Sequence, residues 1–213
     1  MVSKSGFRIG IYICRDLEIS DFAVPYGVFS VARRLDPRLQ AFFIAETLRP
    51  VQMQAGFTVM PNYSFAGLPD MDAVLIPGGF STRRAIVSGR LHAFIRALPE
   101  KTLLVSVSAG SRVYNRMGMV DGPMATDLLE GSNMDMAAAG GTAPARRRTR
   151  TRTANRGGII TGGGIASGME AGFHLLRRSG FGEDVVAEVA RLMEYSTIGE
   201  TGCTGFAYDE GAA

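Results

Sequence analysis

Four short apolar runs constrain the fold of this chain more than any other feature. They cover residues 7–14, 41–46, 73–76 and 102–107, and stretches with helical periodicity follow several of them. Short runs of aliphatic and β-branched residues bounded by Gly, Pro or Asp are typical of strands buried on both faces. Strands that alternate with helices form a parallel sheet with helices on both sides. The pattern therefore predicts an α/β fold with a parallel central sheet.

Helical patterns and turn signals fill the intervals between these runs. Ser20 is the expected N-cap of a first helix, and residues 81–98 are expected to form a second helix. Residues 57–60 are expected to form a further short strand. Two more helices are expected near the C-terminal end, one after the glycines at 162–164 and one that carries Val185, Val189, Leu192 and Met193. This organisation predicts one domain over residues 1–196 and a Gly-rich C-terminal tail over residues 197–213.

Composition limits the function classes. The chain is 46% hydrophobic and 20% charged with a formal net charge of +3, which is ordinary for a soluble globular protein and too weak to indicate a nucleic-acid partner. Its two cysteines and two histidines have no metal-ligand spacing, so we expect no metal and no cofactor. Cys14 is expected to be a buried structural thiol. The N-terminal apolar run is too short for a signal peptide or membrane span, which predicts a cytoplasmic protein without membrane contact.

The run at residues 102–107 ends in small residues, and residues 111–119 can be helical. A strand that turns sharply into a helix forms an elbow, which exposes the side chain at the turn beside the helix N-terminus. The residue at that point is Ser108. Two other loops, residues 16–21 and 77–79, also follow strands. Because ligands bind beyond the carboxyl ends of parallel strands, we expect these three loops to converge on one site.

A run rich in arginine and threonine occupies residues 146–156, and an apolar run follows at 158–161. Its alternation with period two predicts a β-hairpin with Arg150 and Arg152 on one face. The hairpin presents either a solvated strand face or a site for an anionic ligand or nucleic acid. No aromatic residues interleave with the arginines, which disfavours single-stranded nucleic acid.

Four segments in order along the chain form a recognisable set: residues 19–29 (ISDFAVPYGVF), 75–79 (LIPGG), 106–111 (SVSAGS) and 161–170 (TGGGIASGME). Together they resemble the DJ-1/PfpI (ThiJ) superfamily. The similarity is strongest to isonitrile hydratases and to the sensor-like domains of GlxA-type AraC regulators. It extends over residues 7–195, nearly the whole chain.

The resemblance implies a flavodoxin-like three-layer sandwich, a homodimer and a reactive cysteine at the elbow. It also implies an acid hydrogen-bonded to that cysteine and a pocket of backbone amides. Carried over, the acid is Asp21, the nucleophile position is Ser108, and Gly78, Gly79 and Ala109 form the oxyanion or ligand-binding pocket. The chain departs from the family in having serine at position 108. It also lacks the histidine of this branch, since the matching residues 125–127 read Ala-Thr-Asp.

These departures separate several functional hypotheses. A thiol becomes a thiolate near a helix N-terminus, whereas a serine hydroxyl needs a base within hydrogen-bond reach. The first hypothesis is therefore a small-molecule binding protein with weak or no covalent catalysis. The second is an isonitrile hydratase-like enzyme that uses Asp21 and the Ser108 pocket, or a variant of such an enzyme with serine in place of cysteine. A transcriptional regulator is disfavoured because no DNA-binding module follows the domain. In the alternative in which both residues are purely structural, Asp21 only satisfies helix N–H groups and Ser108 only hydrogen-bonds its loop.

Overall fold

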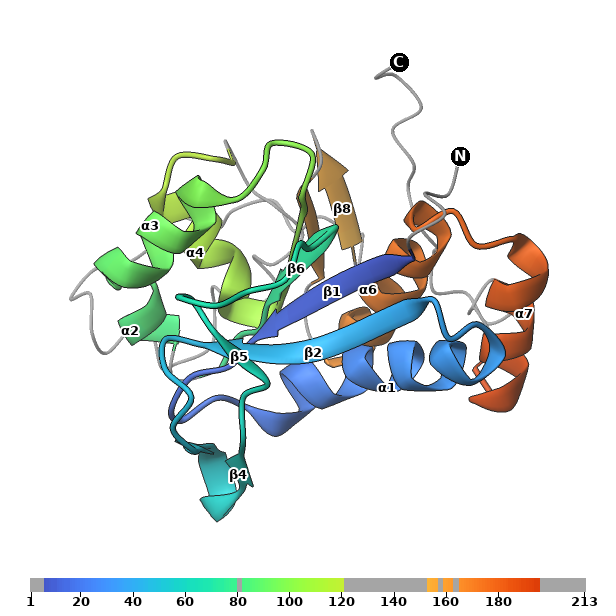
Figure 1. Cartoon of the computed structure of the whole chain (residues 1–213), viewed down its shortest axis with the longest axis horizontal. Coiled ribbons are helices and arrows are strands. Elements are labelled where there is room, and N and C mark those ends of the chain that lie inside the picture. Colours follow the sequence, from blue (N-terminus) through green and yellow to red (C-terminus); the bar gives the residue numbers. More distant parts are fainter. Residues whose placement is uncertain (1–5, 80–81, 121–152, 157–158, 163–164, 196–213) are drawn as a thin grey trace, which may run out of the picture.

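The computed structural model describes residues 6–79, 82–120, 153–156, 159–162 and 165–195. Seven strands form one sheet in the order β5-β2-β1-β6-β7-β9-β8, in which the first six are parallel and β8 pairs antiparallel with β9 (Figure 1). The architecture is that of a flavodoxin-like α/β sandwich, as the alternating apolar runs predict. The strands are β1 (Phe7–Tyr12), β2 (Leu39–Ala45), β5 (Tyr63–Ser64), β6 (Ala73–Ile76), β7 (Leu103–Val107), β8 (Thr153–Arg156) and β9 (Ile159–Gly162).

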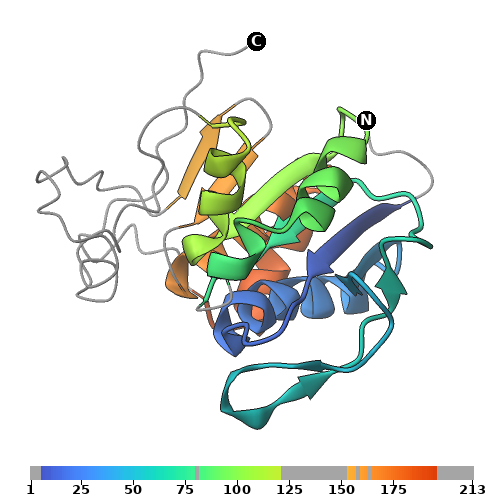
Figure 2. The ribbon, with the colours of Figure 1, turned by 90° about the vertical axis from the view of Figure 1, so that its left-hand side faces the viewer.

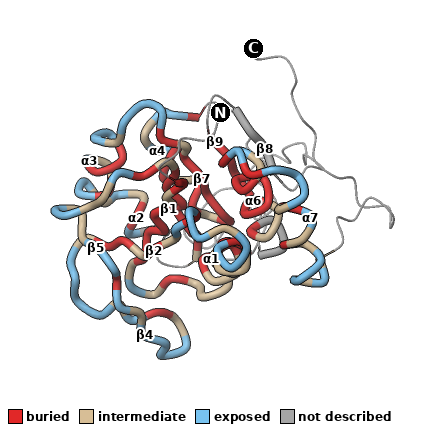
Figure 3. Tube along the Cα trace, turned by 45° about the vertical axis from the view of Figure 1, so that its right-hand side comes forward, coloured by how far each residue is buried: buried red, intermediate tan, exposed pale blue. Residues whose placement is uncertain are grey.

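Helices cover both faces of this sheet. One face carries α1 (Ile19–Leu35), α6 (Ile165–Arg178) and α7 (Glu183–Leu192), and the other carries α3 (Gly89–Ala97) and α4 (Ser111–Arg116), with the short α2 (Thr82–Ala85) beside them (Figures 1 and 2). Strand β6 shows why both faces are apolar. Its Leu75 joins the core under α1 and α6, whereas Val74 and Ile76 join the core under α3 and α4. Burial is therefore concentrated in the strands and the inner faces of the helices (Figure 3).

A small second sheet projects from this body. Strands β3 (Val51–Gln52) and β4 (Thr58–Val59) pair antiparallel around the 3₁₀ turn η1 (Gln54–Gly56), and the hairpin extends away from the sandwich in both ribbon views (Figures 1 and 2). Leu48, Phe57 and Met60, on and beside the hairpin, are 57%, 53% and 59% exposed. Large apolar side chains at such exposure are candidates for a contact surface.

Two local predictions need correction. Helix α1 begins at Ile19, with Glu18 rather than Ser20 at the N-cap, and the Ser20 hydroxyl donates to Glu18 Oε1 at 3.2 Å. The single helix expected over residues 81–98 is two helices, α2 and α3. A new helix starts at Gly89 because Ser88 caps it, its Oγ accepting a hydrogen bond from the Leu91 N–H at 3.2 Å. At residues 81–98 a local cap therefore outweighs the apolar periodicity.

The expected hairpin at the C-terminal part of the sheet exists in part. Strands β8 and β9 pair antiparallel with Arg156 opposite Ile159. Residues 146–152, with Arg150 and Arg152, and the tail at 197–213 lie outside the described residues. Within the parts of the chain that the structure describes, no helix combines the length and apolar character needed to cross a membrane.

Candidate active site

The elbow follows strand β7, which is buried from Leu104 to Val107. Strand β7 ends at Val107, the 3₁₀ turn η2 (Ser108–Gly110) makes the bend, and α4 begins at Ser111. Ser108 has a φ of +54°, in the left-handed region that non-glycine residues rarely adopt. A side chain at Gly110 would overlap the carbonyl oxygen of Ile76, so the bend passes directly over the end of β6. Close packing against the neighbouring strand thus fixes the strained turn.

Asp21 meets the elbow from the first turn of α1. Its side chain is only 3% exposed, and Ser108 is 9% exposed. The Ser108 hydroxyl and the Gly78 backbone N–H both donate hydrogen bonds to the Asp21 carboxylate. The predicted acid and the predicted nucleophile position are therefore in direct contact. The alternative in which Asp21 only satisfies the N–H groups of its own helix is therefore incomplete, because the carboxylate also accepts hydrogen bonds from two other loops.

The glycines at 78 and 79 allow this contact. A Cβ at Gly78 would lie 2.6 Å from the Ala109 nitrogen, 2.8 Å from Asp21 Oδ2 and 2.8 Å from Ser108 Cβ. Gly79 has a φ of +102°, and a Cβ there would lie 2.7 Å from the Glu18 nitrogen. The loops after β1, β6 and β7 therefore converge as the sequence predicts, and only a residue without a side chain fits between them.

The electrostatics of this site are those of a buried acid. Burial, assisted by the negative charge of Glu18, raises the pKa of Asp21 from 3.8 to about 6, while the hydrogen bonds from Ser108 and Gly78 act in the opposite direction. Asp21 is thus poised to exchange a proton near neutral pH. The sequence alone did not single out Glu18. Its position three residues before Asp21, at the N-terminus of a helix, is the signal that would have identified it as a neighbour.

Neither histidine is placed as a base for Ser108. His92 lies within α3. His174 lies nine residues after the start of α6, which is roughly 14 Å along the helix from the carboxyl edge of the sheet. Its buried side chain, near Arg178 and Arg177, has a lowered pKa. Residues 125–127 lie outside the described residues. The described site can therefore bind and orient a polar group and exchange a proton, but it holds a serine hydroxyl without a histidine partner.

The structure also contains a feature that the sequence did not reveal. A cavity of about 460 Å³ lies at the same edge of the sheet, and its lining includes Tyr12, Cys14 and Glu46 but none of Asp21, Gly78, Ser108 or Ala109. Cys14 is half-buried there instead of fully enclosed in the core, because β1 ends two residues before it. Among the described residues, no cluster of three or more His, Cys, Asp or Glu side chains is arranged to hold a metal ion.

The fold of this chain is shared with solved structures of DJ-1 and ThiJ/PfpI proteins. Solved structures with the same fold include DJ-1 from Schizosaccharomyces pombe, with a TM-score of 0.70 and 14% identity over 89% of this chain and 100% of that one. Drosophila melanogaster DJ-1beta gives a TM-score of 0.71 and 16% identity over 90% and 99%. A ThiJ/PfpI family protein from Pseudomonas syringae gives 0.67 and 19% over 97% and 79%.

These comparisons support the resemblance to the DJ-1/PfpI (ThiJ) superfamily that the four sequence segments indicate, and the chain has the fold of its members. It is a distant homologue of the isonitrile hydratase of Pseudomonas putida. The two are 26% identical over 190 residues, which cover 89% of this chain and 78% of the relative. No family model matches the chain.

Proposed function

We propose that the elbow site binds a small polar molecule non-covalently and that Ser108 forms no covalent intermediate. The observation that carries this proposal is the hydrogen bond from Ser108 to Asp21 at the position where the family has a cysteine. A carboxylate with a pKa of about 6 is a weak base for an alcohol, so it orients the hydroxyl more effectively than it deprotonates it. Ser108 and Asp21 then act as a hydrogen-bonding pair beside the amides of Gly79 and Ala109.

A second candidate is hydration of an isonitrile without a covalent enzyme intermediate. Two observations favour it, the homology to an isonitrile hydratase and the near-neutral pKa of Asp21. Protonated Asp21 would donate its proton to the terminal carbon of the isonitrile, and water would then add to that carbon. A proton from the added water would return to the Asp21 carboxylate. The resulting imidic acid would tautomerise to the N-substituted formamide, so the net change is addition of one water.

The two candidates differ in the effect of restoring a thiol. We would measure binding of a small alkyl isonitrile by calorimetry and formamide production by chromatography, for the wild type and for Ser108→Cys, Ser108→Ala and Asp21→Asn. Asp70→Asn, at an exposed position, is the matched control for loss of a carboxylate. The binding proposal expects saturable binding with little turnover by the wild type, and a gain of at least about 100-fold in Ser108→Cys, because a thiolate is the better nucleophile.

The opposite result favours the second candidate. If the wild type turns over as fast as Ser108→Cys, and Asp21→Asn abolishes turnover while Asp70→Asn does not, the purely binding role is wrong. Absence of any saturable binding by the wild type and by Ser108→Ala would overturn both candidates for this substrate class.

We also propose that the protein is a homodimer that uses the β3–β4 hairpin. The exposed Leu48, Phe57 and Met60 support this, since a second copy would cover apolar surface that projects from the body. Phe57→Asp is expected to halve the mass measured by light scattering. Val87→Asp, at an apolar residue that is 70% exposed between α2 and α3, is the control and should leave the mass unchanged. A monomeric wild type would contradict the proposal.

A further inference from the structure

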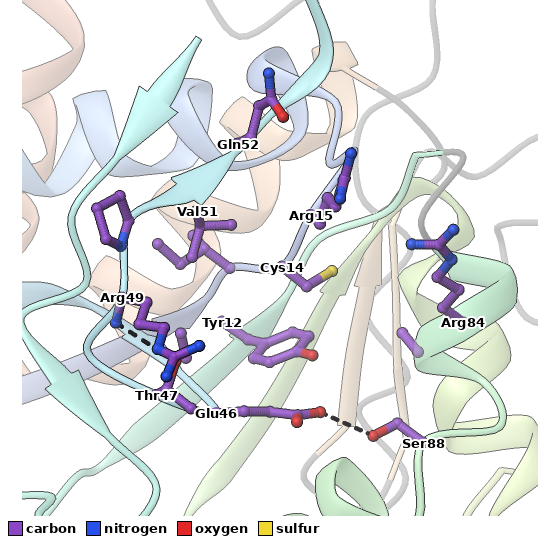
Figure 4. Close-up of a pocket in the computed structure, with 14 residues that line it drawn as sticks. Tyr12, Cys14, Arg15, Glu46, Thr47, Arg49, Val51, Gln52, Arg84 and Ser88 are labelled. Atoms are coloured by element: carbon purple, nitrogen blue, oxygen red, sulfur yellow. Dashed lines mark hydrogen bonds between the residues drawn. The ribbon is translucent and has the colours of Figure 1, made fainter. Parts of the chain in front are cut away.

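The cavity beside the elbow lies between the carboxyl ends of β1 and β2 and the segment from α2 to α3 (Figure 4). One wall is formed by residues 12–15, at and just after the end of β1. Residues 45–47 and 49–52, from the end of β2 to β3, form a second wall, and residues 84, 85 and 88 form the opposite one. Its volume of about 460 Å³ falls in the range of small-molecule sites, roughly 300–1,000 Å³. The cavity is thus large enough for a ligand of its own.

Positive charge dominates its rim. Three lining side chains are arginines, Arg15, Arg49 and Arg84, and each comes from a different segment. Arg15 and Arg84 each approach the carboxylate of Asp16 only to 3.8 Å, with guanidinium groups that are largely exposed. Arg49 forms no ion pair with any residue that the structure describes. Surface ion pairs of this length contribute little, so these guanidinium groups remain available to a ligand.

The one carboxylate that lines the cavity has polar partners of its own. Glu46 Oε1 accepts a hydrogen bond from the Ser88 hydroxyl at 3.1 Å, and Glu46 Oε2 lies 3.6 Å from Arg90 Nη1. Arg90 is not part of the lining. Glu46 and the Asp16 carboxylate beside the rim offset part of the charge of the three lining arginines. Three guanidinium groups against two carboxylates leave a net positive charge, which favours an anion.

The floor supplies neutral polar groups. The Tyr12 side chain is 3% exposed, and its hydroxyl donates a hydrogen bond to the Cys14 thiol. Burial, together with the nearby Cys14 and Glu46, raises the pKa of Tyr12, so this hydroxyl stays protonated at neutral pH. Figure 4 shows the Tyr12 hydroxyl and the Cys14 sulfur between the Glu46 side and the Arg84 side of the cavity.

We propose that this cavity is a second binding site, separate from the elbow, for a small organic anion that carries a carboxylate or phosphate group. Guanidinium groups bind both kinds of oxyanion through paired N–H donors. The anionic group would lie toward Arg49 and Arg84, and the rest of the molecule would extend over Tyr12 and Cys14. The elbow binds its own ligand through Asp21 and Ser108, so the two sites are expected to act independently.

Cys14 allows a direct test, because its thiol reports on the charge of small reagents that enter the cavity. In a Cys203→Ser background, the rates of Cys14 alkylation by anionic iodoacetate and by neutral iodoacetamide are measured by intact mass at constant ionic strength. The ratio of the two rates is then compared with that in Arg49→Gln, Arg84→Gln and Arg96→Gln. Arg96, exposed on α3 and outside the lining, is the charge-matched control.

The proposal expects the iodoacetate-to-iodoacetamide ratio to fall about two- to fivefold in Arg49→Gln and in Arg84→Gln and to stay unchanged in Arg96→Gln. It also expects succinate or glycerol 3-phosphate to protect Cys14 saturably, whereas glycerol gives no protection. Comparison of the two anions identifies the preferred group. Ser108→Ala should leave all these results unchanged, which separates this site from the elbow.

Two outcomes would overturn the proposal. One is an equal ratio in all the arginine variants. The other is protection that sodium chloride reproduces at the same ionic strength, since this would indicate general screening and no bound anion.

Discussion

The hydroxyl of Ser108 donates a hydrogen bond to the buried carboxylate of Asp21, which joins the elbow after β7 to the first turn of α1. This contact needs three conditions at once. Ser108 must adopt a left-handed backbone, Gly78 must lack a side chain, and Asp21 must be held away from solvent. The strain at Ser108 and the burial of Asp21 lead to measurable expectations, as does the packing of the elbow against β6.

Asp21 should make the stability of the protein depend on pH. Its pKa rises to about 6 on folding, so protonation favours the folded state, and this contribution is complete below about pH 4 and lost as the pH rises through 6. Relative to Asp21→Asn, the wild type should lose about 2 kcal/mol of unfolding free energy between pH 4 and pH 7. Urea unfolding across this range measures the difference. Asp70→Asn is the exposed control, and a wild-type curve parallel to that of Asp21→Asn would contradict the assignment.

Two glycine-to-alanine substitutions should have opposite effects. Gly110→Ala places a Cβ into the Ile76 carbonyl, and since backbone atoms cannot yield, we expect a loss of about 3 kcal/mol or more. Gly168→Ala in α6 meets only side-chain atoms at 3.4 Å or more, so its effect should be neutral or a gain of up to about 1 kcal/mol from helix propensity. Thermal unfolding of both variants checks this. Equal losses would mean that the elbow is not packed against β6 as described.

Ser108 should be a strained position. Glycine adopts a φ of +54° without the penalty that a Cβ incurs, of about 1 kcal/mol. Both Ser108→Gly and Ser108→Ala lose the hydroxyl that bonds Asp21, but only the glycine variant relieves the strain. We therefore expect Ser108→Gly to be the more stable of the two in denaturant unfolding. The reverse order would indicate an unstrained elbow.

Thr161 and Thr102 offer a matched pair of threonine-to-valine substitutions. The Thr161 hydroxyl on β9 is fully buried and forms no hydrogen bond among the described residues, whereas Thr102 Oγ1 donates to the Met71 carbonyl at 3.4 Å. Thr161→Val should be neutral or stabilising by about 1 kcal/mol, because a buried unpaired hydroxyl costs free energy. Thr102→Val should be neutral or destabilising. Calorimetric melting of both variants decides the order, and a larger loss at position 161 would show that its hydroxyl has a partner.

The sequence by itself determined the parallel sheet and the place of the site within it. The apolar runs at 73–76 and 102–107 correspond closely to β6 and β7, because buried parallel strands leave a continuous apolar signal. The chain order of the strands and the small residues around Ser108 indicated which loops would meet. Local caps were less visible, since one serine at 88 was enough to divide an expected helix in two.

Only the tertiary structure decided how the residues at this edge differ in environment. The raised pKa of Asp21 depends on burial and on Glu18, and the steric need for Gly78 depends on three atoms from two other loops. The cavity beside β1 and β2 is lined by arginines that are far apart in the chain, so no spacing in the sequence predicts it. Sequence patterns report which face of a strand or helix is buried, whereas charge, exclusion of water and close contact arise only when separate segments come together.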